Sequence, residues 1–450
     1  MTVQNTEKRN FNRAVFALVV PMALQNLINV AVTSADVIML GNVGETVLSA
    51  SSLAGQVQFI LTLIFFGLTS GAAVLTAQYW GKGDTRTIEK VMGISLRFSL
   101  IAALLFTLTI ALLPEQVMRI FSPDADVIRE GADYLRIVCL SYLFMSFTMI
   151  YLNIMRSVER VVISTVVYLV SLITNVLLNA VFIFGLLGLP AMGIRGAALA
   201  TLTARGVELL IVFIYSRRCQ VVRWRLRDVF VRDRLLFRDF LRFALPVIAN
   251  ELMWGLGTSM NAVIIGHLGK AAVSANSVAQ VTRQMATVVT FGIANAAAIM
   301  IGKAIGESNE DRALDYSRRF IRLTLAAGVM GAAVVLAVGP VAKSILNLSA
   351  EAEGYLTVMM LVMAYFVVAQ AFNTTMVVGI FRAGGDTRFG LALDVSTMWG
   401  CSILISAICA FWLKWSVPLV YVVLMSDEII KLPLTMWRYR SRKWLRNVTR

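Results

Sequence analysis

Three long stretches of the chain carry no charged residue, and they constrain the fold more than any other feature. Residues 46–81 form a stretch of 36, residues 161–194 one of 34, and residues 354–381 one of 28. A transmembrane helix needs about 20 consecutive apolar residues. Over the whole chain 58% of the residues are hydrophobic and 15% are charged, whereas soluble domains carry about 25% charge. The sequence therefore predicts an all-α polytopic membrane protein and excludes a soluble or disordered chain.

Charged residues and Gly/Pro turns divide the chain into twelve predicted membrane spans. In the first half they cover residues 14–40, 46–80, 92–113, 134–155, 161–187 and 193–216. In the second half they cover residues 240–266, 272–302, 317–340, 355–381, 387–412 and 416–437. The first apolar run continues past Val30, which is too long for the core of a signal peptide, so we expect it to be retained as a span.

The basic residues favour one orientation of these spans. With the N-terminus in the cytoplasm, the cytoplasmic segments hold 31 of the 41 Lys and Arg residues, and the opposite face holds seven. Cytoplasmic loops of membrane proteins carry such an excess. We therefore expect a multi-pass protein of the plasma (inner) membrane with both termini in the cytoplasm. Anionic lipid headgroups, not nucleic acid, are the expected counter-charge of the net charge of +15.

The chain repeats itself at an offset of 225 residues. Residues 21–81 align with residues 246–306 without a gap and give 16 identities in 61 positions. Within this alignment the phrase GNVGETVLSASSLA meets GHLGKAAVSANSVA. Each half has six spans, so both halves have the same topology, related by an axis along the membrane normal. Parallel repeats with a site between the halves are typical of transporters.

The repeat also predicts how the chain is divided. We expect an N-lobe at residues 1–216, a basic cytoplasmic linker at 217–239, a C-lobe at 240–437 and a basic cytoplasmic tail at 438–450.

Several motifs resemble those of the multidrug and toxic compound extrusion (MATE) family. They are the paired Pro–(19 residues)–Gly-x-x-Gly–Ser-Ala signatures, Asp36 five residues before the first of those glycines, Gly193-Ile-Arg-Gly-Ala-Ala-Leu-Ala-Thr201, and Phe381-Arg-Ala-Gly-Gly-Asp-Thr387. The resemblance covers essentially the whole chain. It implies two pseudo-symmetric lobes of six helices, no cofactor, and export of cationic or amphipathic small molecules in exchange for inward Na+ or H+. We also expect a monomer.

Six acidic residues lie within the predicted spans, and each needs a reason, because a charge at mid-membrane costs about 2.5–3.5 kcal/mol. Glu208 follows Arg205 by three residues, and Glu428 precedes Lys431 by three, so we expect two local ion pairs. Asp427 has no evident partner in the sequence. The remaining three acids, Asp36, Glu251 and Asp394, are candidates for function.

Asp36 is the candidate coupling residue, and it aligns with the neutral Asn261 of the other half. Asn175 and Asn179 lie four residues apart on one face of span five, and Thr201 lies in span six. One carboxylate with amide and hydroxyl oxygens suits a hard cation such as Na+, for which Asp36, Asn175 and Asn179 are the candidate ligands. The resemblance carries all four residues to the family's N-lobe cation site. Some members have an acid where this chain has Asn179, so the choice between Na+ and H+ stays open.

A second predicted site, for substrate or a second ion, lies in the C-lobe. Its central residue is Glu251 in the middle of span seven, which aligns with the neutral Asn26. The other candidates are Asp394 in span eleven, Arg283 in span eight, and Gln370 and Asn373 in span ten. Arg283 either compensates Glu251 or Asp394 or extends to the membrane interface. Because the acids of the two halves are not symmetric, we expect one lobe to bind the ion and the other the substrate.

Two other functions stay open. A lipid-intermediate flippase of the same superfamily would favour further helices or a strongly basic cavity, and only Arg97, Arg205 and Arg283 lie within the spans. A membrane-embedded transferase would need a catalytic His pair or clustered acids, and the chain has a single histidine, His267. An enzyme is therefore not expected. The sequence also contains no phosphate-binding Gly-x-x-x-x-Gly-Lys-[Ser/Thr] loop, so ATP is not expected to drive transport directly.

Overall fold

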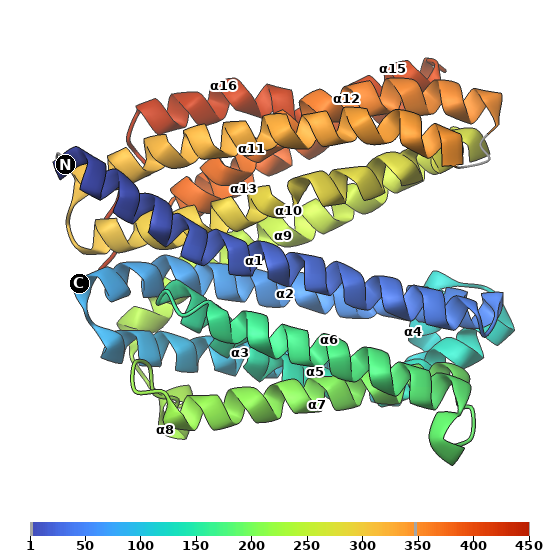
Figure 1. Ribbon diagram of the computed structural model, residues 1–450, viewed down its shortest axis with the longest axis horizontal. Coiled ribbons are helices and arrows are strands. Elements are labelled where there is room, and N and C mark those ends of the chain that lie inside the picture. Colours follow the sequence, from blue (N-terminus) through green and yellow to red (C-terminus); the bar gives the residue numbers. More distant parts are fainter. Residues whose placement is uncertain (1–2, 346–348, 450) are drawn as a thin grey trace. The chain divides into compact units, whose positions relative to one another are not determined.

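The computed structural model describes residues 3–345 and 349–449. Residues 1–2, 346–348 and 450, which belong to the predicted N-lobe, C-lobe and tail, lie outside the described residues. The described chain consists of helices joined by short connections (Figure 1). Ten of these helices are long and apolar enough to cross a membrane. The two other predicted spans lie in α9 (Arg234–His267) and in the pair α15 (Val417–Leu424) and α16 (Asp427–Arg440), so all twelve predicted spans fall on helix.

By its internal contacts the chain divides into two compact units. The N-unit comprises Leu24–Thr76 and Gly83–Ile248, and the C-unit comprises Met1–Ala23, Ala77–Lys82 and Ala249–Arg450. Helices α1, α2 and α9 each contribute residues to both units. Each unit is described here by itself.

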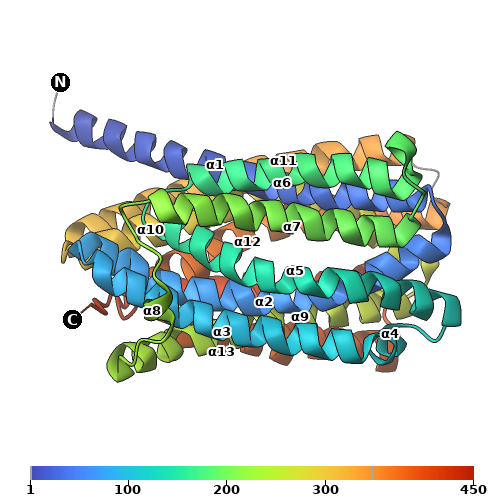
Figure 2. The same cartoon turned by 90° about the horizontal axis from the view of Figure 1, so that it is seen from below.

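The N-unit is a bundle in which α6 and α7 lie side by side and α5 packs against both α3 and α7 (Figures 1 and 2). Asp84 accepts a hydrogen bond from the backbone of Thr87 at the start of α3, and Asp124 caps α5 in the same way. The helices of this unit are α1 (Val3–Gly41, from Leu24 on), α2 (Glu45–Lys82, up to Thr76), α3 (Thr85–Leu112), α4 (Pro114–Phe121), α5 (Ala125–Ser157), α6 (Val162–Phe184), η1 (Leu186–Gly188), α7 (Gly193–Arg218), α8 (Leu226–Val229) and the start of α9.

The C-unit is built around α10, which packs against α11 and α12. Two of its spans contain π-helical turns, in which backbone hydrogen bonds join residues five apart, as often occurs at functional sites. Its helices are the rest of α9, α10 (Lys270–Gly306), α11 (Glu310–Ile345), α12 (Ala350–Thr374), η2 (Thr375–Phe381), α13 (Thr387–Asp394), η3 (Val395–Ile403), α14 (Leu404–Ala407), η4 (Ile408–Trp412), α15 and α16.

The last predicted span differs from a single helix, because it is interrupted. Helix α15 ends at Leu424, where the Met425 amide donates to the Tyr421 carbonyl, and α16 begins after Ser426. The Ser426 hydroxyl bonds the Val423 carbonyl at 2.6 Å. The break therefore places Asp427 and Glu428 in the first turn of a new helix.

The basic segment 217–239 is folded onto α3 of the N-unit. Asp228 in α8 accepts two hydrogen bonds from the Arg86 guanidinium, at 2.6 and 2.9 Å. Arg97, one of the three basic residues within predicted spans, donates to the carbonyl oxygens of Val229 and Val231. The positive charge of Arg97 is thus directed to the backbone of this segment.

The chain after α16 is also packed, within the C-unit. Trp444 is fully buried. The Gln78 amide group donates to the carbonyls of Ala383 and Arg446 at 2.7 and 3.1 Å and accepts from the Val448 amide at 2.7 Å. The C-terminal residues are therefore bound to the ends of α2 and η2.

Candidate functional site

The four residues of the predicted coupling site come together in the N-unit. Asp36 lies near the end of α1, Asn175 and Asn179 on α6, and Thr201 on α7. Because α6 and α7 pack along their length, residues of their facing sides lie close together. The Asn179 side-chain nitrogen donates to Asp36 Oδ1 at 2.5 Å and to Asn175 Oδ1 at 3.2 Å. The Asn175 nitrogen lies 3.5 Å from the Thr201 hydroxyl.

This N-unit site leaves one acceptor free inside the protein. Asn179 is fully buried, and its side-chain oxygen has no hydrogen-bond partner. Buried polar atoms without a partner are rare and need an explanation. Among the described residues of the site, Asp36 is contacted by the Asn179 amide and by no basic side chain within ion-pair distance. A carboxylate, a free amide oxygen and a hydroxyl are together suited to accept a cation or a proton donor.

Glu208 lies on the same helix as Thr201 and is compensated locally. Arg205 Nη1 contacts its two carboxylate oxygens at 2.8 and 3.0 Å, and the Glu208 side chain is 1% exposed. The predicted ion pair of these two residues is confirmed.

In the C-unit, Glu251 on α9 pairs with Arg382, which follows η2. Arg382 Nη2 lies 2.8 Å from Glu251 Oε1, and both side chains are largely buried. For Arg283 the sequence left two alternatives open, and in the described part of the chain it lies within ion-pair distance of neither Glu251 nor Asp394; its Nε donates to Gln280 Oε1 on its own helix at 2.8 Å. The sequence contained Arg382 within the Phe381–Thr387 motif, but a partner 131 residues away from Glu251 leaves no spacing signal.

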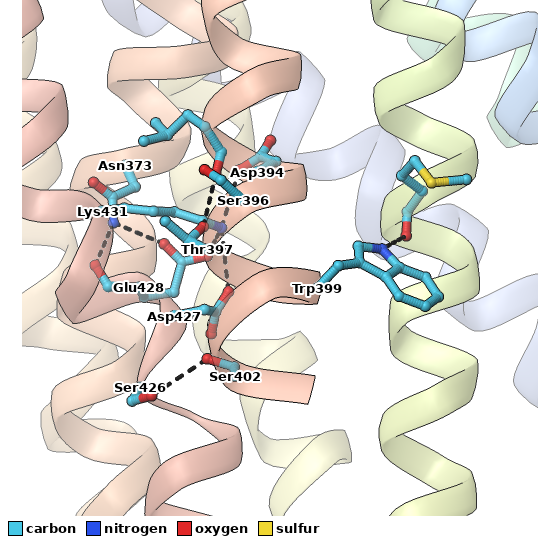
Figure 3. A network of polar contacts seen from close by, with 12 residues as sticks. Asn373, Asp394, Ser396, Thr397, Trp399, Ser402, Ser426, Asp427, Glu428 and Lys431 are labelled. Atoms are coloured by element: carbon cyan, nitrogen blue, oxygen red, sulfur yellow. Dashed lines mark hydrogen bonds and ion pairs between the residues drawn. The ribbon is translucent and has the colours of Figure 1, made fainter. Parts of the chain in front are cut away.

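Four further charged groups of the C-unit form one buried cluster, which Figure 3 shows. We call Asp394, Asp427, Glu428 and Lys431 the C-unit cluster. The Lys431 ammonium lies 3.0 Å from Asp394 Oδ1, 3.2 Å from Asp427 Oδ2 and 3.2 Å from Glu428 Oε1. The predicted pair of Glu428 and Lys431 is confirmed, and the partner of Asp427 is the same lysine, four residues further along α16.

Neutral amides support the acids of this cluster. Asn373 on α12 donates to Glu428 Oε2 at 2.8 Å and accepts from the Thr435 hydroxyl at 3.2 Å. Asn250, next to Glu251 on α9, donates to Asp394 Oδ2 at 3.0 Å. Of the predicted second-site residues, the structure thus connects Asp394 and Asn373 to one cluster and Glu251 to Arg382. Gln370 is buried one turn before Asn373, and its side-chain oxygen has no partner.

The described part of the chain contains no cluster of His, Cys and acidic side chains that suggests a metal centre. A group of three or more His, Cys, Asp or Glu side chains arranged to hold a metal ion does not occur among residues 3–345 and 349–449.

Comparison with known proteins agrees with this architecture. A family model described as MatE matches residues 21–181 and again residues 246–408, more than half of the chain. The two matches begin 225 residues apart, which is the offset of the internal repeat. The uncharacterized transporter YisQ of Bacillus subtilis is 22% identical to this chain over 96% of it and 95% of the relative.

Further relatives and solved structures also match most of the chain. A probable multidrug resistance protein NorM of Bradyrhizobium diazoefficiens is 28% identical over 88% of this chain and 85% of the relative. A multidrug resistance MATE family transporter solved in an outward-facing conformation superposes with a TM-score of 0.86 at 20% identity, covering 96% of each chain. A MOP superfamily transporter from Pyrococcus furiosus has the same TM-score, covering 95% of each chain. The predicted all-α, two-lobe fold is confirmed, and the chain belongs to the MatE family of membrane transporters and is not an enzyme.

Proposed function

We propose that this transporter is a secondary active multidrug efflux antiporter, which exports cationic or amphipathic small molecules in exchange for Na+ or H+ by alternating access. The observation that carries the proposal is the N-unit site. Its carboxylate, Asp36, is held by a neutral amide, whereas the other acids within the spans are held by Arg or Lys. A carboxylate without a fixed positive partner is the group best suited to bind an exchangeable cation or proton.

The same site can serve either coupling ion. Na+ would be held by Asp36, the free Asn179 oxygen, Asn175 and the Thr201 hydroxyl, all of which are hard oxygen ligands. A proton would instead reside on Asp36, and the Asn179 amide would turn to accept from the resulting hydroxyl. In both cases the negative charge of Asp36 is cancelled. Coupling then requires that one conformation of the transporter bind the ion better than the other, because equal affinity shifts no equilibrium.

The C-unit acids belong, in this proposal, to the substrate side. Glu251 and its arginine partner are buried, and the cluster around Lys431 carries three carboxylates for one ammonium. An excess of carboxylates favours a cationic substrate over an anionic lipid intermediate. The observations therefore support efflux of cations over lipid flipping.

We further propose that the protein is a monomer in the plasma membrane with both termini in the cytoplasm. The excess of basic residues on one side of the spans supports this orientation. The segment 217–239 and the C-terminal residues then lie on the cytoplasmic side, where their arginines contact anionic lipid headgroups.

Replacement of Asp36 tests the coupling role. Asp36→Asn removes the charge and keeps the size of the side chain, so we expect gradient-driven export of a fluorescent cationic dye from proteoliposomes to be lost while protein insertion stays normal. Imposing Na+ and H+ gradients separately on the unchanged protein identifies the coupling ion. Asn179→Ala removes a neutral ligand and is expected to weaken export less.

The matched control is Asp126→Asn, because Asp126 lies on α5 of the same unit with its side chain 74% exposed. This variant should export the dye at the normal rate. Full export by Asp36→Asn under either gradient would show that the coupling ion binds elsewhere.

A further inference from the structure

A groove on the surface of the N-unit has no part in the site described above. It lies between α5 and α7, which pack side by side (Figure 2), and its volume is about 500 Å³. Apart from Gly206, its lining consists of apolar and aromatic side chains of these two helices and of Trp224. Leu210 and Phe213 are 58% and 38% exposed, so the groove opens to the surroundings of the bundle. On a membrane span such a groove is suited to hold a lipid acyl chain.

A glycine keeps this groove open. A side-chain carbon at Gly206 would lie 4.0 Å from the Phe144 ring, which is ordinary contact, so the space beyond it is empty because the residue has no side chain. A larger side chain at this position would occupy the groove without forcing the two helices apart.

The basic segment 217–239 closes one end of the groove with an aromatic ring. The centroid of the Trp224 ring lies 5.4 Å from that of Phe147 and 5.9 Å from that of Phe213, both in edge contacts. The Arg217 guanidinium lies 5.1 Å from the centroid of the Phe213 ring and 5.9 Å from that of Trp224. Cation–π contacts hold a guanidinium in place without cancelling its charge. The groove therefore has an apolar body and a positioned positive charge at one end.

Two donors at this end have no partner among the described residues. The buried Trp224 Nε1 has no hydrogen-bond partner, although buried indole N–H groups usually have one. Arg217 is exposed, and within residues 3–345 and 349–449 it forms neither a hydrogen bond nor an ion pair. Its planar fork of N–H groups matches the oxygens of a phosphate. An oxygen-rich anion is thus the group that this end of the groove lacks.

The charges around Trp224 favour an anionic headgroup over a zwitterionic one. Arg223 and Arg225 flank Trp224 in the chain, close enough to add to its positive surroundings. Glu89 accepts from the Arg223 backbone amide and from an arginine of α3, and Asp228 accepts from the same arginine. The ammonium group of a zwitterionic lipid would find no unpaired carboxylate among these side chains. A lipid without that ammonium group would meet positive charge alone.

We propose that the groove binds one anionic phospholipid, whose acyl chain lies between α5 and α7 and whose phosphate is bound by Arg217 beside Trp224. The lipid belongs to the cytoplasmic leaflet, an assignment that rests on the orientation in the proposed function. The site itself depends neither on Asp36 nor on the coupling ion. Because α5, α7 and the start of the basic segment all contact the groove, the bound lipid joins this segment to the bundle. A ligand that binds only the folded state also stabilises it.

The test counts retained lipids by native mass spectrometry. The full-length protein in detergent is mixed with phosphatidylglycerol and, separately, with phosphatidylcholine of the same acyl chains. We expect each monomer to retain one phosphatidylglycerol at concentrations at which phosphatidylcholine is lost. Arg217→Gln removes a charged donor and should weaken retention by about tenfold or more. Arg217→Lys keeps the charge but not the planar fork, so its effect should be intermediate.

Two substitutions at Gly206 test the apolar part of the site. Gly206→Leu fills the groove and should abolish retention of the lipid without changing a charge. Gly206→Ala, whose added carbon has room beside Phe144, should keep the lipid. Thermal unfolding in phosphatidylcholine should give the same midpoint for both variants, which shows that a loss of lipid does not reflect misfolding. The Arg217 variants, at an exposed position, give a readout that does not depend on this packing.

The matched control is Arg218→Gln, which removes the same charge from the next exposed residue of α7. This variant should keep the selective lipid. Equal losses for the substitutions at Arg217 and Arg218, or equal retention of phosphatidylcholine, would overturn the proposal. So would a protein dimer that Gly206→Leu dissociates, because a second copy of the chain would then occupy the groove. Since nothing is transported in this test, a failure of the proposed efflux function would leave its result intact.

Discussion

At the level of single residues, the buried acids of the spans are compensated by different kinds of partner. Glu208 in the N-unit has a dedicated arginine three residues away, and Glu251 in the C-unit has one that is distant in the sequence. Asp36 has an amide. Charges that are fully paired are fixed parts of the structure, so the acid held only by a neutral group is the one free to exchange its counter-ion.

The Arg205–Glu208 pair gives a test of how strongly such fixed charges matter for stability. Arg205→Met leaves Glu208 buried without its partner, which should cost about 3–5 kcal/mol of unfolding free energy. The double variant Arg205→Met with Glu208→Gln should recover most of that loss, because no charge stays unpaired. Thermal and denaturant unfolding in detergent measure both.

The exposed pair Asp126–Arg129 has the same three-residue spacing and serves as the control. Its side chains are 74% and 72% exposed at 3.7 Å, so Arg129→Met should change stability by less than about 1 kcal/mol. Equal losses for the two pairs would mean that Glu208 is not effectively buried.

Local spacing decided which of these contacts the sequence could predict. Arg205–Glu208 and Glu428–Lys431 are neighbours on a helix face and were predictable from a spacing of three. Asn175 and Asn179 were predictable as one face for the same reason. The Glu251–Arg382 pair and the contact of Asn250 with Asp394 join residues more than 100 positions apart, so they required the fold.

At the level of elements, the positions of the helices were predictable from the sequence, but their irregularities were not. Unbroken apolar runs predict spans, and every predicted span falls on helix. The break at Ser426 and the π-helical turns leave the hydrophobic pattern unchanged, so they were not predictable. Both occur beside the C-unit cluster.

Close packing of α2 on α9 within the N-unit depends on two glycines spaced as Gly-x-x-x-Gly. A side-chain carbon at Gly67 would lie 2.6 Å from the Ile248 side chain, and one at Gly71 would lie 2.7 Å from the Ala244 side chain. Small residues allow helix backbones to approach in membrane proteins. We expect Gly67→Ala and Gly71→Ala each to lower the thermal unfolding midpoint, because two backbones must move apart.

Gly55 on the same helix provides the control for that prediction. A side-chain carbon there meets nothing within 4 Å, so Gly55→Ala should be neutral or should stabilise by about 0.5–1 kcal/mol through helix propensity. A destabilisation by Gly55→Ala as large as that by Gly71→Ala would contradict the packing argument.

At the scale of the whole molecule, the distribution of basic residues predicts which ends face the cytoplasm. The four native cysteines are first replaced by serine, and then either Lys414→Cys or Arg442→Cys, both at exposed positions, is introduced. A membrane-impermeant maleimide should label the cysteine at position 414 in intact cells. The cysteine at 442 should react only after permeabilisation. The reverse pattern would invert the topology.

The internal repeat also bears on which half of the chain binds the ion and which half binds the substrate. The repeat aligns Asp36 with Asn261 and Glu251 with Asn26, so each half has a neutral amide where the other half has its acid. If Asp36 takes the ion, Asp36→Asn should abolish the ion-induced conformational change, measured by spin-label distances, and leave dye binding partly intact. Glu251→Gln keeps an acceptor for Arg382 but removes the charge. It should therefore alter dye affinity or selectivity and leave the ion-induced change measurable. Identical defects of both variants in both assays would mean that one shared site serves ion and substrate.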